Sequence, residues 1–228
     1  GLTHFRNLAS TGADRATFVP PTTAIGNSLR FALTATLIAV TVGLLAAAVV
    51  SYRRGVMSRW FDTLLMLPLG TSAVTIGFGF LVALDAPIDL RTSVALIPIA
   101  HAVVAVPFVV RTTVPVMRSV RHRLREAAMT LGAAPHTVWR LVDLPLVARA
   151  ALVGAGFAFA VSLGEFGATS FITRPDRPTV PVAIFRFLGQ PGALNFGRAM
   201  AMSTILMALT AAVIVAIDRL RVGHVGEF

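Results

Sequence analysis

The sequence of 228 residues contains no cysteine and no lysine, and few charged side chains of any kind. Without cysteine, the chain can form neither a disulfide bond nor a cysteine-ligated metal site. Without lysine, it cannot contain the phosphate-binding loop G-x-x-x-x-G-K-[ST], whose lysine contacts the nucleotide phosphates. Charged residues make up 13% of the chain, against about 25% in soluble globular domains. This composition excludes a water-soluble globule.

What the chain does contain is apolar sequence, at 56% hydrophobic residues and a mean hydropathy of +0.79. A helix needs about 20 apolar residues to cross a hydrocarbon core roughly 30 Å thick. The runs are far longer than barrel strands and do not alternate, so helices must satisfy the backbone in lipid. The fold class predicted is therefore all-α, a polytopic membrane bundle of about five transmembrane helices. The five predicted spans are Phe31–Val50, Thr63–Leu84, Ser93–Val110, Ala150–Thr173 and Ala199–Ile217.

The net charge of +10 arises from arginine. In a soluble protein it would suggest binding to nucleic acid, but these arginines cluster between spans, so we expect no nucleic-acid partner. Cytoplasmic loops are enriched in basic residues, which places the arginine-rich loops 51–62 and 111–125 inside and the nearly neutral loop 85–92 outside. The external loop 174–198 fits poorly, since it carries four arginines and Asp176 as its one acidic residue. The stronger inner loops predict an external N-terminus and a cytoplasmic C-terminus.

The loop 118–145 is polar and basic and contains two helix signals. The residues from Arg118 to Leu131 favour a helix, and Gly132 can end it in a left-handed conformation. Pro135 suits the first position of a second helix, because the missing amide proton is not needed there. Pro145 is expected to end this unit before the fourth span. The pattern predicts a helix, a turn and a helix against the inner membrane face.

The surface of this loop suggests a docking site. Small side chains at Ala127 and Ala128, beside Leu131, would allow close approach of a partner surface, as when a helix enters a groove. Composition alone is also compatible with a simpler interpretation, in which the loop is an amphipathic connector that only fixes topology.

The motif Glu126-Ala127-Ala128, three residues, Gly132, nine residues, Val142, one residue, Leu144-Pro145 resembles the EAA motif of ABC importer permeases. Val142 stands where that family usually has isoleucine. The resemblance extends from about Thr23 to Arg221 and implies the type I ABC importer permease fold, with this loop as a coupling helix in a cleft of a cytoplasmic ATPase subunit. The coupling residues it implies are Glu126, Ala127, Ala128, Leu131, Gly132, Val142, Leu144 and Pro145.

A second segment, "SLGEFGATSFITRPDRPTVPVAIFRFLG", is similar to permeases for iron(III), thiamine, molybdate and sulfate, and its continuation "RPTVPVAIFRFLG" is most similar to the iron(III) and thiamine group. These resemblances imply a permease that takes iron(III) or thiamine from an external binding protein in the bacterial inner membrane. They also imply a second permease half and separate ATPase subunits. The chain itself is then no enzyme and needs no cofactor.

The resemblance also divides the chain. Residues 1–26 are expected to form an external lead-in, residues 27–221 the transmembrane domain and residues 222–228 a cytoplasmic tail. The first residue is Gly1, and an odd number of helices with an external start is unusual. We therefore expect a fragment of a longer permease, such as one with two fused halves.

Two polar residues within the apolar runs are candidates for the translocation path or gate. Glu165 is an ionisable group in a span, where such groups usually face the bundle interior or water, although it could also reach the membrane interface. His101 could contact substrate or metal, but a single histidine makes no metal site, and a hydrogen-bonded packing role is the simpler interpretation. An alternative function would be an ion-coupled secondary transporter that uses Glu165.

Four glycines in the predicted spans are expected to mark close contacts between helices, because glycine lets two backbones approach. They are Gly77, Gly79, Gly154 and Gly156.

The predicted orientation can be tested by cysteine labelling, since the chain has no native cysteine. Single cysteines at Ser58 and Ser119 should be shielded from a membrane-impermeant thiol reagent in intact cells, whereas one at Thr92 should react. Labelling of Ser119→Cys from outside would reverse the assigned topology.

Overall fold

The computed structural model describes residues 5, 8, 20–52, 55–84, 91, 93–119 and 122–222, with the side chains of 122–125 and 220–222 left aside. Every regular element in these ranges is helical, which confirms the all-α class. Thr92, the predicted tail after residue 222 and most of the predicted lead-in lie outside the described residues. The first long helix begins at Pro21, which lies inside the segment 1–26 that the sequence assigns to the lead-in.

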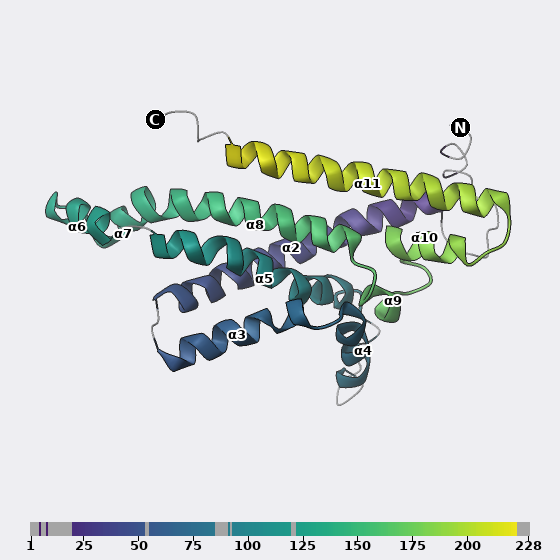
Figure 1. Cartoon of the computed structure of the whole chain (residues 1–228), viewed down its shortest axis with the longest axis horizontal. Helices are drawn as coiled ribbons and strands as arrows, with labels where there is room; N and C mark the ends of the chain where they lie inside the picture. Colours follow the sequence, from purple (N-terminus) through teal and green to yellow (C-terminus); the bar gives the residue numbers. More distant parts are fainter. Residues whose placement is uncertain are drawn as a thin grey trace.

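Long helices dominate the described chain (Figure 1). Those that could cross a membrane run from Pro21 to Tyr52 (α2), Leu96 to Ser119 (α5), Pro135 to Gly164 and Ala193 to Arg219. A bent pair can supply a fifth crossing, which agrees with the predicted number of about five. The last crossing belongs to α11 (Ala193–Val222).

The predicted second span, Thr63–Leu84, is not one helix. It consists of the end of α3 (Val56–Gly70) and all of α4 (Ala73–Ala83), which are bent by 106°. Thr71 and Ser72 between them have extended backbones, with ψ of 142° and 133°. Hydropathy measures how apolar the residues of the two helices are. It does not report the change of backbone conformation between them.

The predicted fourth span, Ala150–Thr173, also has different ends. The helix α8 (Leu144–Gly164) stops at Gly164, and the extended residue Glu165 leads into the short helix α9 (Thr169–Ile172). The amphipathic helix α10 (Val180–Leu188) then precedes α11. The break follows from the side chain of Glu165, which bonds to the first amides of α9 as described below.

Pro145 does not end the loop unit. The helix α6 (His122–Thr130) is followed by α7 (Pro135–Val138), and a π-helical turn, η1 (Trp139–Asp143), joins α7 directly to α8. The amide of Leu144 bonds to the carbonyl oxygen of Trp139, one residue further back than in an α-helix. Pro145 therefore lies inside a continuous helix, where it has no amide proton to donate, and the π-helical turn directly before it accommodates that interruption.

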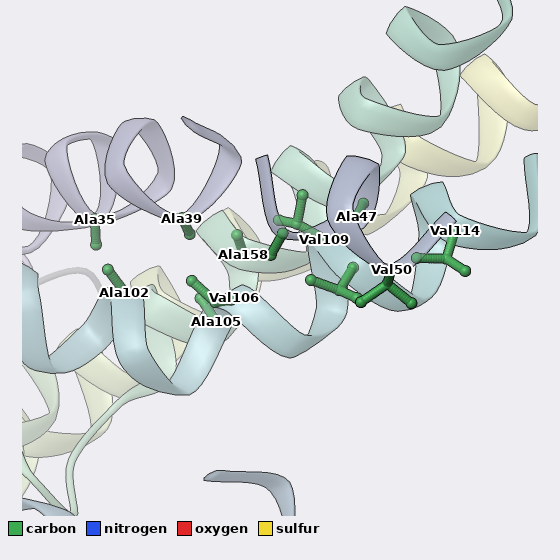
Figure 2. Close-up of a cluster of buried hydrophobic side chains, with 12 residues drawn as sticks. Ala35, Ala39, Ala47, Val50, Ala102, Ala105, Val106, Val109, Val114 and Ala158 are labelled. Carbon is green, nitrogen blue, oxygen red and sulfur yellow. The ribbon is translucent and has the colours of Figure 1, made fainter. Parts of the chain in front are cut away.

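The centre of the bundle is α5, which packs between α2 and α8. Its apolar window is 61% buried, whereas that of α11 is 17% buried. The side chains at the centre are almost all alanine and valine, so the helices approach closely (Figure 2). The buried cluster consists of Ala35, Ala39, Ala46, Ala47, Val50, Ala102, Ala105, Val106, Val109, Val110, Val114 and Ala158.

Val109 of α5 is the tightest part of this cluster. A Cβ atom added to Gly43 of α2 would lie 2.7 Å from the Val109 Cβ, and one added to Gly154 of α8 would lie 3.1 Å from the Val109 Cα. Both distances are shorter than ordinary van der Waals contacts. Val109 therefore fits between two neighbouring helices because each presents a glycine to it.

Three of the four predicted contact glycines do lie at close contacts. Gly154 faces α5, an added Cβ at Gly156 would overlap Ile217 of α11, and one at Gly77 would lie 2.6 Å from the backbone of Ala168. The prediction for Gly79 is wrong for the described part of the chain, because no atom there outside its own helix lies within 4 Å of the added Cβ. Glycine content alone does not tell which face of α4 meets a neighbour.

Gly77 and Gly79 form a matched pair on one helix. We expect Gly77→Ala to lower the free energy of unfolding by about 1–3 kcal/mol, because the new methyl group meets backbone that cannot move aside. Gly79→Ala should raise it by roughly 0.4–1 kcal/mol, since alanine restricts the unfolded chain and nothing obstructs it. Unfolding curves of the two purified variants in one detergent would check this. Equal effects of the two substitutions would argue against the α4 contact.

Candidate functional site

The turn between α6 and α7 is a Schellman turn closed by glycine. Gly132 has a φ of +83°, as the sequence predicts. Its amide donates to the carbonyl oxygen of Met129 at 2.9 Å, and the amide of Ala133 donates to that of Ala128 at 3.0 Å. These are the two bonds that define the motif. Pro135 opens α7 in the first turn, also as predicted.

This helical hairpin projects from one end of the bundle (Figure 1) and exposes large apolar side chains. Leu131 at the turn is 89% exposed, and Leu141 is 70% exposed. Trp139 and Met129 are also exposed. Exposed apolar side chains can mark sites of interaction with a protein or with a membrane. We call this hairpin the α6–α7 tip and define it as residues 126–141.

The residues of the EAA-like motif fall into two groups in the structure. Glu126, Ala127 and Gly132 are exposed on α6 and its turn, with Ala128 half-buried. Val142, Leu144 and Pro145 lie further along, where η1 passes into α8, and of these Val142 is half-buried. The first group forms the accessible tip, and the second lies where the tip joins the bundle.

A buried polar cluster lies where α8 ends against α5. The Nδ1 atom of His101 is 2.7 Å from the Ser162 hydroxyl oxygen, and its Nε2 atom is 2.6 Å from the Thr169 hydroxyl oxygen. The same Nε2 atom is 3.4 Å from a carboxylate oxygen of Glu165. All four side chains belong to residues that are at most 6% exposed. The structure therefore brings both predicted path residues, Glu165 and His101, into one network.

Glu165 acts as a cap for the helix that follows it. Its two carboxylate oxygens accept hydrogen bonds from the amides of Ala168 at 2.9 Å and Thr169 at 3.0 Å. The Thr169 hydroxyl donates to the second oxygen at 2.5 Å. A helix leaves its first amides without internal partners, and this carboxylate supplies them. At 6% exposure, Glu165 does not reach out to the membrane interface as one interpretation of the sequence expected.

One arrangement of protons satisfies the whole cluster. Thr169 has one hydroxyl proton, which it donates to Glu165, so it must accept a hydrogen bond from His101 Nε2. His101 Nδ1 can then accept from the Ser162 hydroxyl. A neutral ring protonated on Nε2 satisfies all of these bonds at once. His101 is held as a hydrogen-bonded side chain between α5, α8 and α9, the arrangement that the packing interpretation describes.

Ser162 and Thr169 were missed from the sequence. They lie 61 and 68 residues from His101 along the chain. The one feature of the sequence that could have identified them is their position, three residues before and four residues after Glu165. Among the described residues, no group of three or more metal-ligating histidine or acidic side chains occurs.

Residues 39–222 match the family of binding-protein-dependent transport system inner membrane components. The chain belongs to this family. The permease is 31% identical over 214 residues to the molybdenum transport system permease protein ModB of Mycobacterium tuberculosis, an alignment that covers 86% of this chain and 78% of the relative. It is 27% identical over 194 residues to PhnV of Salmonella typhimurium, whose name assigns it to 2-aminoethylphosphonate transport, with 85% and 72% covered.

A longer relative is also similar over nearly the whole permease sequence. The protein y4fN of Sinorhizobium fredii, named as an ABC transporter permease, is 27% identical over 227 residues. This alignment covers 97% of the present chain but 39% of y4fN, so the chain spans well under half the length of that relative.

The capping role of Glu165 generates a stability prediction. Glu165→Gln keeps the shape but replaces one acceptor oxygen by a donor, so one of three buried donors loses its partner. We expect a loss of about 1–3 kcal/mol in the free energy of unfolding, measured on the purified permease in detergent. The exposed residue Asp218 in α11 provides a control, and Asp218→Asn should change stability by less than about 0.5 kcal/mol. If both variants unfold like the original protein, the cap does not stabilise the corner.

Proposed function

We propose that this permease forms half of the transmembrane path of an ATP-driven importer in the bacterial inner membrane. It receives its solute from an external binding protein and opens to alternate sides as separate ATPase subunits close. The proposal rests on family membership and on one observation in particular, the exposed α6–α7 tip.

The tip has the features expected of a coupling element. It is a compact hairpin whose turn is fixed by Gly132, and it carries Leu131 at 89% exposure. In a membrane protein such a hairpin lies beyond the lipid, where an exposed leucine and tryptophan gain most from a protein partner. A groove on a cytoplasmic ATPase subunit would cover them and transmit movement to α8, which follows directly in the chain.

The energy source must come from another chain on this proposal. The sequence contains no lysine for a phosphate-binding loop, so nucleotide would be bound by the subunits that dock on the tip. The arginine-rich segments 51–62 and 111–125, which include the end of α5 and the starts of α3 and α6, support a cytoplasmic position of the tip. The N-terminus of the chain would then be external and its C-terminus cytoplasmic, and a second permease half would complete the path.

Two observations bear on the solute, a sequence segment and the names of the relatives, and they point to different solutes. The segment "RPTVPVAIFRFLG" is similar to permeases for iron(III) and thiamine, whereas the relatives above are named for molybdenum and 2-aminoethylphosphonate. Uptake of each of these four solutes by cells that express the complete transport system, with and without the permease, distinguishes them. Uptake driven by an ion gradient without ATP would instead favour a secondary transporter that uses Glu165.

Substitutions at Gly132 test the coupling role. In Gly132→Val, the left-handed backbone of the turn costs the branched side chain roughly 1–2 kcal/mol. The valine side chain also adds bulk at the docking surface. We expect the helices to remain folded and inserted while uptake is lost, through loss of ATPase binding or of coupling. Glu126→Ala should reduce uptake more mildly. Uptake assays and copurification of the ATPase measure the two effects.

Gly132→Asn separates strain from bulk, because asparagine tolerates the left-handed conformation. Among the residues that the structure describes, no atom outside the turn lies within 4 Å of a Cβ at position 132, so we expect any loss in this variant to reflect the partner. Loss of uptake in both variants indicates contact at Gly132, and loss in the valine variant alone indicates strain in the turn. Normal uptake with normal ATPase binding in Gly132→Val would leave the loop as a mere topological connector.

A further inference from the structure

A cavity of about 510 Å³ lies between α2, the start of α5 and the segment that leads from α9 to α10. This is the end of the bundle opposite the α6–α7 tip (Figure 1). The volume falls in the range of roughly 300–1,000 Å³ that small-molecule sites occupy. The cavity differs from most of the bundle surface because many of its lining side chains are polar.

One face of α2 supplies most of these polar side chains. Thr23, Asn27, Arg30 and Thr34 all line the cavity, at intervals of four, three and four residues. This spacing places them on one side of a helix. The strongly apolar part of this helix is the run Phe31–Val50, and Thr23, Asn27 and Arg30 all precede it. The polar stripe therefore lies mostly at the end of the helix, where it can face water or a solute.

The opposite wall is fixed to α2 by hydrogen bonds. The side-chain amide of Asn27 donates to the carbonyl oxygen of Pro178 at 3.2 Å. The amide of Val180 donates to the hydroxyl oxygen of Ser28 at 2.8 Å, and Ser28 is 5% exposed. These bonds join segments more than 150 residues apart, so the cavity is a built feature of the fold.

The charges at the cavity favour an anion. Arg30 comes from α2, and Arg177 comes from the opposite wall beside Asp176. The Arg177 Nε atom lies 3.4 Å from an Asp176 carboxylate oxygen. Among the described residues that line the cavity, the two guanidinium groups and the one carboxylate leave an excess of one positive charge. Guanidinium groups present a planar set of donors that matches the geometry of carboxylate and phosphate oxygens.

We propose that this cavity binds the oxyanion group of the transported solute, such as a phosphonate, a phosphate or a metal oxyanion. The inference rests on the proposed importer function and names its substrate class. Arg30 and Arg177 bind the anionic oxygens, and the α2 hydroxyl and amide groups provide further hydrogen bonds. A solute whose only charge is positive, such as thiamine, gains nothing from this arrangement.

The test uses the full-length permease with its ATPase, purified in a maltoside detergent that carries no phosphate group. Molybdate, 2-aminoethylphosphonate, inorganic phosphate and thiamine are titrated separately, and the rise in the unfolding midpoint reports binding to the folded state. We expect at least one of the three oxyanions, and not thiamine, to raise the midpoint. Failure of all three oxyanions to do so overturns the proposal.

Single substitutions test whether the oxyanion binds at this cavity. Arg30→Gln and Arg177→Gln should each weaken oxyanion binding about tenfold or more, the effect of losing hydrogen bonds between charged groups. Asp176→Asn should strengthen it, because one negative charge leaves the cavity wall. Arg174→Gln is the matched control, since Arg174 belongs to the same segment but does not line the cavity, and should bind like the original protein. Oxyanion binding that Arg30→Gln and Arg177→Gln leave unchanged contradicts the assignment.

Lipid headgroups carry the same phosphate chemistry, so a further arm adds phosphatidylglycerol to the detergent. Competition by this lipid at Arg30 and Arg177 supports the oxyanion site and identifies a second source for its ligand. The inference and the importer proposal can also fail separately. Oxyanion binding without ATP-driven uptake of any candidate solute keeps the site and removes the importer. ATP-driven uptake of thiamine that both arginine substitutions leave unchanged supports the importer function and overturns the oxyanion site.

Discussion

The contact of Val109 with Gly43 and Gly154 is the constraint on which the rest of this bundle depends. Helices in lipid gain little from the hydrophobic effect when they associate, because lipid tails are as apolar as their own side chains. Close packing must replace it, and the glycines remove the atoms that would hold α2 and α8 away from α5. Alanines along the same interfaces continue the close approach on both sides of Val109 (Figure 2).

This central packing fixes the positions of two quite different ends. At one end, the α6–α7 tip leaves the bundle and exposes its apolar side chains. At the other, α8 stops at Glu165, whose carboxylate starts α9 while His101 ties the corner back to α5. The helix α4 packs on that same corner, where Gly77 of α4 meets Ala168 and Gly167 of the corner meets Ala73 and Val74. Polar bonds thus hold the end at which the chain turns sharply, and apolar packing holds the straight middle.

The sequence predicts those features that depend on one segment at a time. Apolar length locates the membrane helices, and the left-handed turn at Gly132 follows from the one residue type that adopts it without strain. The break at Thr71 and Ser72 could not be predicted, because hydropathy measures the preferred solvent of a segment and not its backbone path. The π-helical turn was hidden for a similar reason, since Pro145 is also a normal sign of a new helix start.

Features that join distant segments are harder to predict. Glu165 and His101 can be recognised in the sequence as polar residues in apolar runs. Their partners Ser162 and Thr169 cannot, because they meet His101 only when α8 and α9 pack against α5. The same holds for the stripe on α2, whose spacing is visible in the sequence, whereas Arg177 opposite it comes from a loop about 150 residues away. Pairing across the fold is a property of tertiary packing.

The π-helical turn makes one rod of what the sequence divides into a loop and a span. From Pro135 to Gly164 the helix is continuous for 30 residues, about 45 Å at the rise of an α-helix. Gly154 of this helix rests against Val109, and the helix ends beside the cluster of His101 and Glu165. A partner bound at the tip would therefore contact the same helix that packs on α5 and borders the polar corner.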